Sequence, residues 1–299
     1  MNPLTDFSLT GRVALVTGAG RGIGAAIARA FAAAGAAVAL VARTQADIEA
    51  VAAEIEANAR EAGIPPSSEP VRGPSRGASP GAAGAESGKR EATGRRAVAL
   101  PADVKDLTRL PGLVERTVGQ LGGLDIVVNN AGGEITPPFL ETRVEHLEAA
   151  FHFNVSVPFE LSRLAVPHLL ARPGASIINM SSIVVGKSVR AHLAHHTGKA
   201  AEAQLTRSMA ADLGPRIRVN AILPGAVETE ALRDYMDARD PDLRDALIAN
   251  TRLRRIATPE DIAHAAVYLA SPAASWVTGL LLELDGGAVD ETRPMFPDL

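Results

Sequence analysis

The chain has 299 residues, 46% of them hydrophobic, which is enough to bury one large core or two of ordinary size. Its 30 basic and 34 acidic residues are mixed along the sequence and give a net charge of -4, which excludes the basic face of a nucleic-acid or anionic-membrane binder. Cysteine is absent, which excludes disulfides and thiolate chemistry. Without a signal-peptide pattern or a membrane-length apolar stretch, we expect a cytoplasmic protein.

Short apolar runs alternate with helical patterns along the chain. The run at 13–16 ends in a glycine cluster and precedes an alanine-rich helical segment at 25–34. Residues 37–41 form a second run, and apolar side chains then recur at helical spacing behind Thr44, a capping residue. Further strands are predicted at 97–100, 126–128, 176–180, 218–222 and 280–284.

This alternation is typical of right-handed βαβ units. It predicts an α/β fold: one Rossmann-type domain over 1–299, with a doubly wound parallel sheet of about seven strands and helices on both faces. Binding sites in such folds lie beyond the carboxyl ends of the strands.

One segment, 63–95, interrupts the alternation. Of its 33 residues 17 are Gly, Pro or Ser, and Ile64 and Val71 are its only sizeable apolar side chains. Such a segment buries too little to offset its ordering entropy, so it predicts a disordered low-complexity insertion.

The sequence "VTGAGRGIG" follows the first strand and opens a helix. Its glycines are spaced Gly18-x-x-x-Gly22-x-Gly24, with Ile23 where the G-x-G-x-x-G pattern has its third glycine. Glycines permit a tight turn, and the helix N-terminus presents free N–H groups to a pyrophosphate. The context favours a nucleotide site over a plain tight turn.

The end of the second strand bears on the cofactor. An acidic residue there binds the ribose 2'-hydroxyl of NAD, but no Asp or Glu occurs between Gly24 and Asp47. Arg43 follows Ala42, and Arg21 lies in the glycine loop, so two guanidinium groups are available for a 2'-phosphate. These charges favour NADP over NAD, unless both arginines are merely solvated.

Ordered motifs now identify a family. They are "TGAGRGIG" at 17–24, "ADV" at 102–104, "NNAG" at 129–132, Asn154, Ser182, Lys199 and "LPGAVET" at 223–229. Outside the insertion, the chain resembles the classical short-chain dehydrogenase/reductase family over nearly its whole length. Within that family, "NNAGG" followed by "PPF", together with "SPAASWVTG", is most similar to bacterial hydroxysteroid dehydrogenases of the 7α type.

The resemblance implies a role for each matching position. Asp103 and Val104 would cover the adenine, and Asn154 would support a water chain that carries protons to Lys199. The positions that would flank the nicotinamide and its ribose are Asn130, Ala131, Gly132, Pro224, Gly225, Val227 and Thr229. The remaining cofactor contacts would come from Thr17, Gly18, Arg21, Gly22, Ile23, Gly24, Arg43, Thr44 and Lys199.

Hydride transfer to or from a carbon needs a matching proton on the oxygen. The family uses a tyrosine four residues before the lysine and 13 after the serine that polarises the substrate oxygen. Counting back from Lys199 and forward from Ser182 reaches the same residue, His195. The chain's only tyrosines, Tyr235 and Tyr268, lie in later segments where we expect helices of other function.

Three interpretations of this departure follow. His195 replaces the phenol as acid and base, although an imidazole reaches roughly 2 Å less far and the Lys199 charge keeps it neutral, which favours alcohol oxidation. Alternatively, the chain is a catalytically impaired dinucleotide-binding protein with a sensing or scaffolding role. In the third, His192, His195 and His196 bind a metal; because no carboxylate or cysteine completes the ligands, we expect no metal.

The predicted function is therefore an NAD(P)-dependent oxidoreductase that prefers NADP and acts on a secondary alcohol or ketone, steroid-like or acyl-like. The resemblance implies a homodimer or homotetramer formed through helices near 140–170 and 195–215, with no nucleic-acid or membrane partner. Residues 230–255 would form a lid over the substrate but carry no chemistry that names it.

Overall fold

The computed structural model describes residues 3–61, 96–133, 137–187, 190–239 and 242–288. The predicted insertion at 63–95 lies outside these residues. Within them, no helix is both long enough and apolar enough to span a bilayer.

The strands form one parallel sheet in the order β3-β2-β1-β4-β5-β6-β7. They are β1 Val13–Thr17, β2 Ala37–Ala42, β3 Ala97–Pro101, β4 Ile126–Asn129, β5 Ala175–Met180, β6 Ile217–Pro224 and β7 Leu281–Leu284. The prediction of a Rossmann-type α/β fold with about seven strands is confirmed, and the strand ends differ from the predicted ones by one or two residues.

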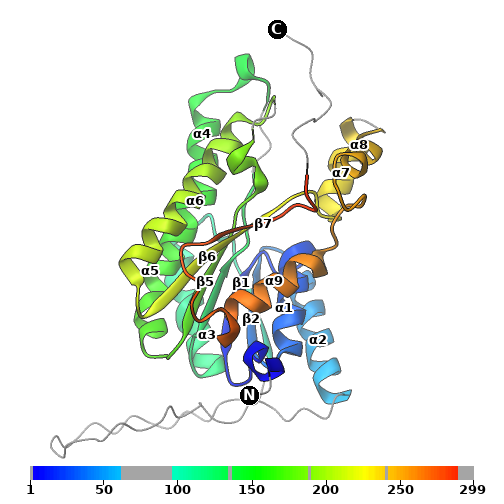
Figure 1. Cartoon of the computed structure of the whole chain (residues 1–299). Coiled ribbons are helices and arrows are strands. Elements are labelled where there is room, and N and C mark those ends of the chain that lie inside the picture. Colours follow the sequence, from blue (N-terminus) through cyan, green and yellow to red (C-terminus); the bar gives the residue numbers. More distant parts are fainter. Residues whose placement is uncertain (1–2, 62–95, 134–136, 188–189, 240–241, 289–299) are drawn as a thin grey trace, which may run out of the picture.

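Helices cover both faces of this sheet (Figure 1). They are α1 Gly22–Ala33, α2 Gln45–Glu61, α3 Leu110–Leu121, α4 Val144–Phe151, α5 Val157–Leu170, α6 Leu193–Leu213, α7 Glu230–Arg239, α8 Leu243–Ala249 and α9 Pro259–Ala270. Strand residues alternate between two cores: Ala14 and Val16 pack on the side of α1, α2 and α9, while Val13 and Leu15 pack on the side of α3 and α5. The helix α4 packs against α6 on that second side.

The sheet changes direction between β1 and β4. From β1 the chain adds β2 and β3 on one side, then returns to place β4 on the other side of β1. The loops after β1 and β4 therefore diverge and leave a crevice at the carboxyl ends of the strands, where open α/β sheets bind their ligands.

Candidate active site

The glycine loop at this crevice is built for close backbone approach. Gly18 has a φ of +66°, which favours glycine, and a Cβ on Gly24 would overlap the Gly18 carbonyl oxygen. The first turn of α1 contains no acidic residue, and its N-cap, Arg21, makes no side-chain cap. The positive end of the α1 dipole and its N-terminal N–H groups are thus available to an anion.

Thr17 joins the loop after β4 to the end of β1. Its hydroxyl oxygen accepts hydrogen bonds from the backbone N–H groups of Asn130 and Ala131, both at 3.0 Å, and donates to the Val128 carbonyl at 3.3 Å. The Asn130 amide nitrogen in turn donates to the Thr17 carbonyl at 2.9 Å. These bonds fix the loop after β4, which is predicted to lie beneath the nicotinamide ribose, relative to the glycine loop.

The residues predicted to bind the adenosine half lie along the edge formed by β2 and β3. Arg43 and Thr44 are exposed just after β2, Asp103 is exposed after β3, and Val104 is buried in the core. The Asp103 carboxylate accepts from the Lys105 backbone N–H at 3.0 Å, as in an ordinary turn.

Arg21 extends from the glycine loop to the start of α7. Its guanidinium donates to the Glu230 carboxylate at 2.7 Å, and both side chains are more than half exposed. Asp47, a residue the sequence reasoning passed over, packs beside Gly20 and Ala42 on the glycine-loop side of α2. Acidic groups therefore lie close to the predicted 2'-phosphate site.

Asn154 lies in a π-helical turn, His152–Ser156, between α4 and α5. Its side chain is fully buried; its amide nitrogen donates to the Ala150 carbonyl at 2.8 Å, and its oxygen accepts from the Gly133 N–H at 2.9 Å. A buried amide is costly unless bonded, and both ends of this one are satisfied. The π turn brings Asn154 against the β4 loop, as such turns often do at functional sites.

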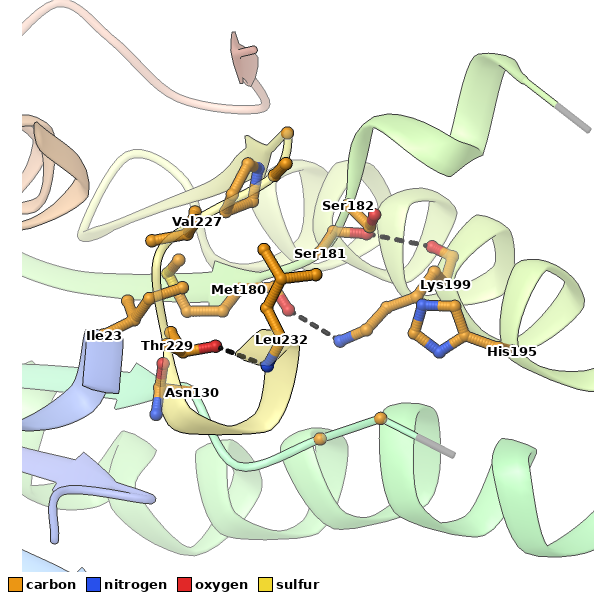
Figure 2. A pocket seen from close by; sticks show the side chains of 15 residues that line it. Ile23, Asn130, Met180, Ser181, Ser182, His195, Lys199, Val227, Thr229 and Leu232 are labelled. Carbon is orange, nitrogen blue, oxygen red and sulfur yellow. Dashed lines mark hydrogen bonds between the residues drawn. The ribbon is translucent and has the colours of Figure 1, made fainter. Parts of the chain in front are cut away.

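The remaining predicted residues meet around one cavity of ≈ 290 Å³ (Figure 2). Ser182 follows β5 and caps the short 3-10 helix Ile183–Gly186, while His195 and Lys199 lie one turn apart at the start of α6. Those that line the cavity are Ile23, Asn130, Gly132, Ser182, His195, Lys199, Pro224, Gly225, Val227 and Thr229. The loops after β1, β4, β5 and β6 thus meet the start of α6 at one cavity.

His195 lies one helical turn before Lys199 and lines the cavity, at the place where the family resemblance predicts the phenol. Burial lowers the pKa of its imidazole to about 4, and the charges of Lys199, His196 and His192 lower it in the same direction. Its buried Nδ1 atom has no hydrogen-bond partner within the described part of the chain. The ring is therefore neutral near pH 7, with its proton-accepting form populated but its basicity reduced.

Lys199 makes two hydrogen bonds inside the protein. Its Nζ donates to the Met180 carbonyl at 2.7 Å and to the Glu202 carboxylate at 2.8 Å. Both charged side chains are buried, and burial raises the pKa of Glu202 to about 7 against the lowering effects of Lys199 and Ser181. The sequence reasoning missed Glu202, although an acidic residue three positions after Lys199 was a readable signal.

The histidines of α6 form a ring cluster with a tyrosine of α7. His192 stacks on His196 at a centroid distance of 5.7 Å, and its Nε2 lies 3.4 Å from the Tyr235 hydroxyl. Tyr235 and Tyr268 lie in α7 and α9, and neither is among the described residues that line the cavity. No three His, Cys, Asp or Glu side chains among the described residues could hold a metal ion, so the three-histidine alternative gains no support.

The sheet order, its crevice and the glycine turn define a Rossmann-type α/β protein. The sequence profile described as enoyl-(acyl carrier protein) reductase matches residues 81–289, and that of short chain dehydrogenase matches 12–65. An uncharacterized oxidoreductase of Mycobacterium tuberculosis is 42% identical over 95% of this chain and 94% of the relative.

Two comparisons concern 7α-hydroxysteroid dehydrogenase. That of Escherichia coli K12 is 34% identical over 96% of this chain and 97% of the enzyme. A crystallised 7α-hydroxysteroid dehydrogenase in complex with NADH and 7-oxoglycochenodeoxycholic acid has a TM-score of 0.81 and 33% identity, with 98% of this chain and 100% of that one covered. The chain belongs to the short-chain dehydrogenase/reductase family of oxidoreductases.

Proposed function

We propose that this protein is an NADP-preferring dehydrogenase/reductase that transfers a hydride between its cofactor and a secondary alcohol or ketone. The supporting observation is the convergence of Ser182, His195 and Lys199 on one cavity with the loops after β1, β4 and β6. Family relatives named 7α-hydroxysteroid dehydrogenase make a steroid-like substrate the first class to test.

The residues at the crevice fit a dinucleotide. Gly24 leaves no room for a side chain between the loop and the helix, and the acid-free first turn of α1 suits a pyrophosphate. When bound, the cofactor supplies or accepts the hydride at its nicotinamide ring. Among the residues that would hold it, Thr229 and Val227 face the cavity beside Ile23.

The chain's own side chains would handle the proton. Ser182 would hydrogen-bond the substrate oxygen, and His195 would take its proton in the alcohol-to-ketone direction. A pKa of about 4 keeps His195 in the unprotonated form that oxidation needs near neutral pH, although as a weak base, and leaves the protonated donor scarce, so we expect oxidation to be the favoured direction. Lys199 would hold the nicotinamide ribose, and Asn154 would support the proton path.

The preference for NADP rests on Arg43. Arg43 is exposed and comes directly after Ala42, the last residue of β2. NAD-binding members of the fold have a carboxylate at the end of this strand. Arg21 is paired with Glu230, so it would have to exchange partners before it could serve a 2'-phosphate. The preference therefore depends on one arginine more than on two.

A turnover assay tests this proposal. Purified protein is given NADP or NADPH, and separately NAD or NADH, with 7α-hydroxy and 7-oxo bile acids and simpler alcohols and ketones, and the nicotinamide absorbance is followed. The expected result is conversion between one alcohol and its ketone that depends on the cofactor.

The alternative of a dinucleotide-binding protein with a sensing or scaffolding role is favoured by one observation: no tyrosine is among the described residues that line the cavity. Cofactor binding without turnover, together with activity gained on His195→Tyr substitution, would establish that alternative and refute the enzyme proposal.

We also propose a homodimer or homotetramer. Large apolar side chains stand exposed along α4, α5 and the turn before them, an arrangement typical of an interface. They are Phe139, Leu140, Val144, Phe151 and Phe159. Light scattering after gel filtration gives the mass in solution, and a monomer would contradict this assembly.

A further inference from the structure

The Glu202–Lys199 pair lies at the wall of the cavity: Lys199 lines it, and Glu202 is not among the described lining residues. Lys199 is 5% exposed and Glu202 1% exposed, and they lie three residues apart on α6. The Ser181 hydroxyl donates to the Lys199 carbonyl at 3.1 Å, which ties the same turn of α6 to the end of β5. The ammonium and the carboxyl group are therefore held in contact with little exposure to solvent.

Burying both charges is expensive. Each ion loses several kcal/mol of hydration, which their attraction recovers only when the geometry is good, and an apolar pair of similar volume is often equally stable. Because a buried ion pair adds little stability, its presence beside a ligand cavity is better explained by a role in ligand binding than by stability alone.

The geometry shows what the pair controls. Two hydrogen bonds, to Met180 and Glu202, fix the Lys199 ammonium, and Figure 2 shows the lysine side chain turned toward the Met180 carbonyl. A Cβ on Gly132 would lie 3.0 Å from Nζ and 2.9 Å from the Asn154 oxygen. The ammonium thus lies against the loop that contains Gly132, which is predicted to lie beneath the nicotinamide ribose.

We propose that Glu202 is a positioning residue of this site, whose buried carboxylate holds the Lys199 ammonium against the Gly132 loop, where it can serve the cofactor. The proposal rests on the proposed function, since it assumes that Lys199 meets the cofactor ribose. Glu202 itself need not touch the cofactor, because it acts through Lys199.

The test measures NADPH affinity by fluorescence titration of folded, full-length variants. At pH 8.5, where Glu202 with its pKa of about 7 is ionised, Glu202→Gln keeps the shape and one hydrogen-bond acceptor but loses the charge. We expect its dissociation constant to rise about tenfold, the effect of weakening one charge-assisted hydrogen bond. Glu202→Asp should recover most of the affinity. Asp212→Asn, which removes an exposed charge from the same helix, should match the unaltered protein.

A double-variant comparison separates positioning from a structural role. Lys199→Met removes the group through which Glu202 acts, so the variant with both Lys199→Met and Glu202→Gln should bind NADPH no more weakly than Lys199→Met alone. Urea unfolding of each variant identifies any loss that comes from partial unfolding. If Glu202→Gln fails to fold alone, the double variant and Glu202→Asp still give the answer.

The outcomes separate the two proposals. Unchanged NADPH affinity in Glu202→Gln, or additive losses in the double variant, would overturn the role of Glu202 while leaving the oxidoreductase proposal intact. Unaltered protein that binds NADPH but converts substrate only after His195→Tyr substitution refutes the enzyme and leaves the Glu202 comparison decisive. Failure of the unaltered protein to bind either NADPH or NADH overturns both.

Discussion

The low pKa of His195 has a measurable effect on the pH dependence of turnover. With a pKa of about 4, roughly one imidazole in a thousand carries a proton at pH 7. Ketone reduction consumes that protonated form, so kcat/KM for reduction should fall about tenfold per pH unit above pH 4, or about 100-fold from pH 5 to pH 7. Alcohol oxidation uses the neutral ring, so kcat/KM for oxidation should be flat above about pH 5.

Substituting His195→Tyr should change this profile in a defined way. A phenol has an ordinary pKa near 10 and reaches roughly 2 Å further, so reduction should become independent of pH through neutrality and faster at pH 7. His195→Gln should remove both activities. His196→Gln, which alters the next residue outside the cavity lining, should keep both activities and move the profiles only slightly to higher pH, because His196 is a minor cause of the lowered pKa of His195.

The assay follows nicotinamide absorbance in both directions across buffers from pH 5 to pH 8, with substrate far below KM. Reduction by the unaltered protein that stays constant over this range would refute a titrating His195 as the proton donor. So would full activity in His195→Gln.

Three further outcomes are expected. Unfolded His195 gains a proton below pH 6.5 and the folded one only below about 4, whereas buried Glu202, with its raised pKa, acts in the opposite direction over much of this window. The test therefore compares urea titrations of the unaltered protein with those of His195→Gln, which keeps Glu202: as the pH drops from 6.5 toward 4, the free energy of unfolding of the unaltered protein should fall by up to about 3 kcal/mol relative to that of the variant. Arg43→Ala should weaken NADPH binding about tenfold or more and leave NADH binding unchanged in the same titration; equal losses for both cofactors would contradict the 2'-phosphate role. Gly24→Ala should lower both NADPH affinity and the urea midpoint because its Cβ meets the Gly18 carbonyl, whereas Gly119→Ala, with nothing within 4 Å, should bind normally and be slightly more stable.

Much of the fold could be predicted because it depends on local patterns. Short apolar runs between helical segments predicted the parallel sheet, and the counts from Ser182 and Lys199 located His195, which the structure places in the same cavity. These counts predict spatial positions because residues four apart on a helix lie on the same face, one turn from each other.

The contacts that the sequence did not reveal depend on burial and on distant partners. A charged residue on a helix usually faces water, so the three-residue spacing between Lys199 and Glu202 could suggest a pair but not its burial, which depends on the packing of α6 on β5 and β6. The Arg21–Glu230 ion pair and the Tyr235–His192 contact join residues far apart in the chain, and no local pattern specifies them.

The cavity draws its walls from both halves of the sheet, with Ile23 after β1 on one side and Val227 after β6 on the other. Neither half alone can form it, so cofactor affinity should appear only after the complete sheet has assembled during folding. Conversely, a bound cofactor stabilises the whole sheet by mass action, by about 2.7 kcal/mol at a free concentration 100 times its dissociation constant. Resistance of this protein to heat and to proteolysis should then follow the supply of its cofactor.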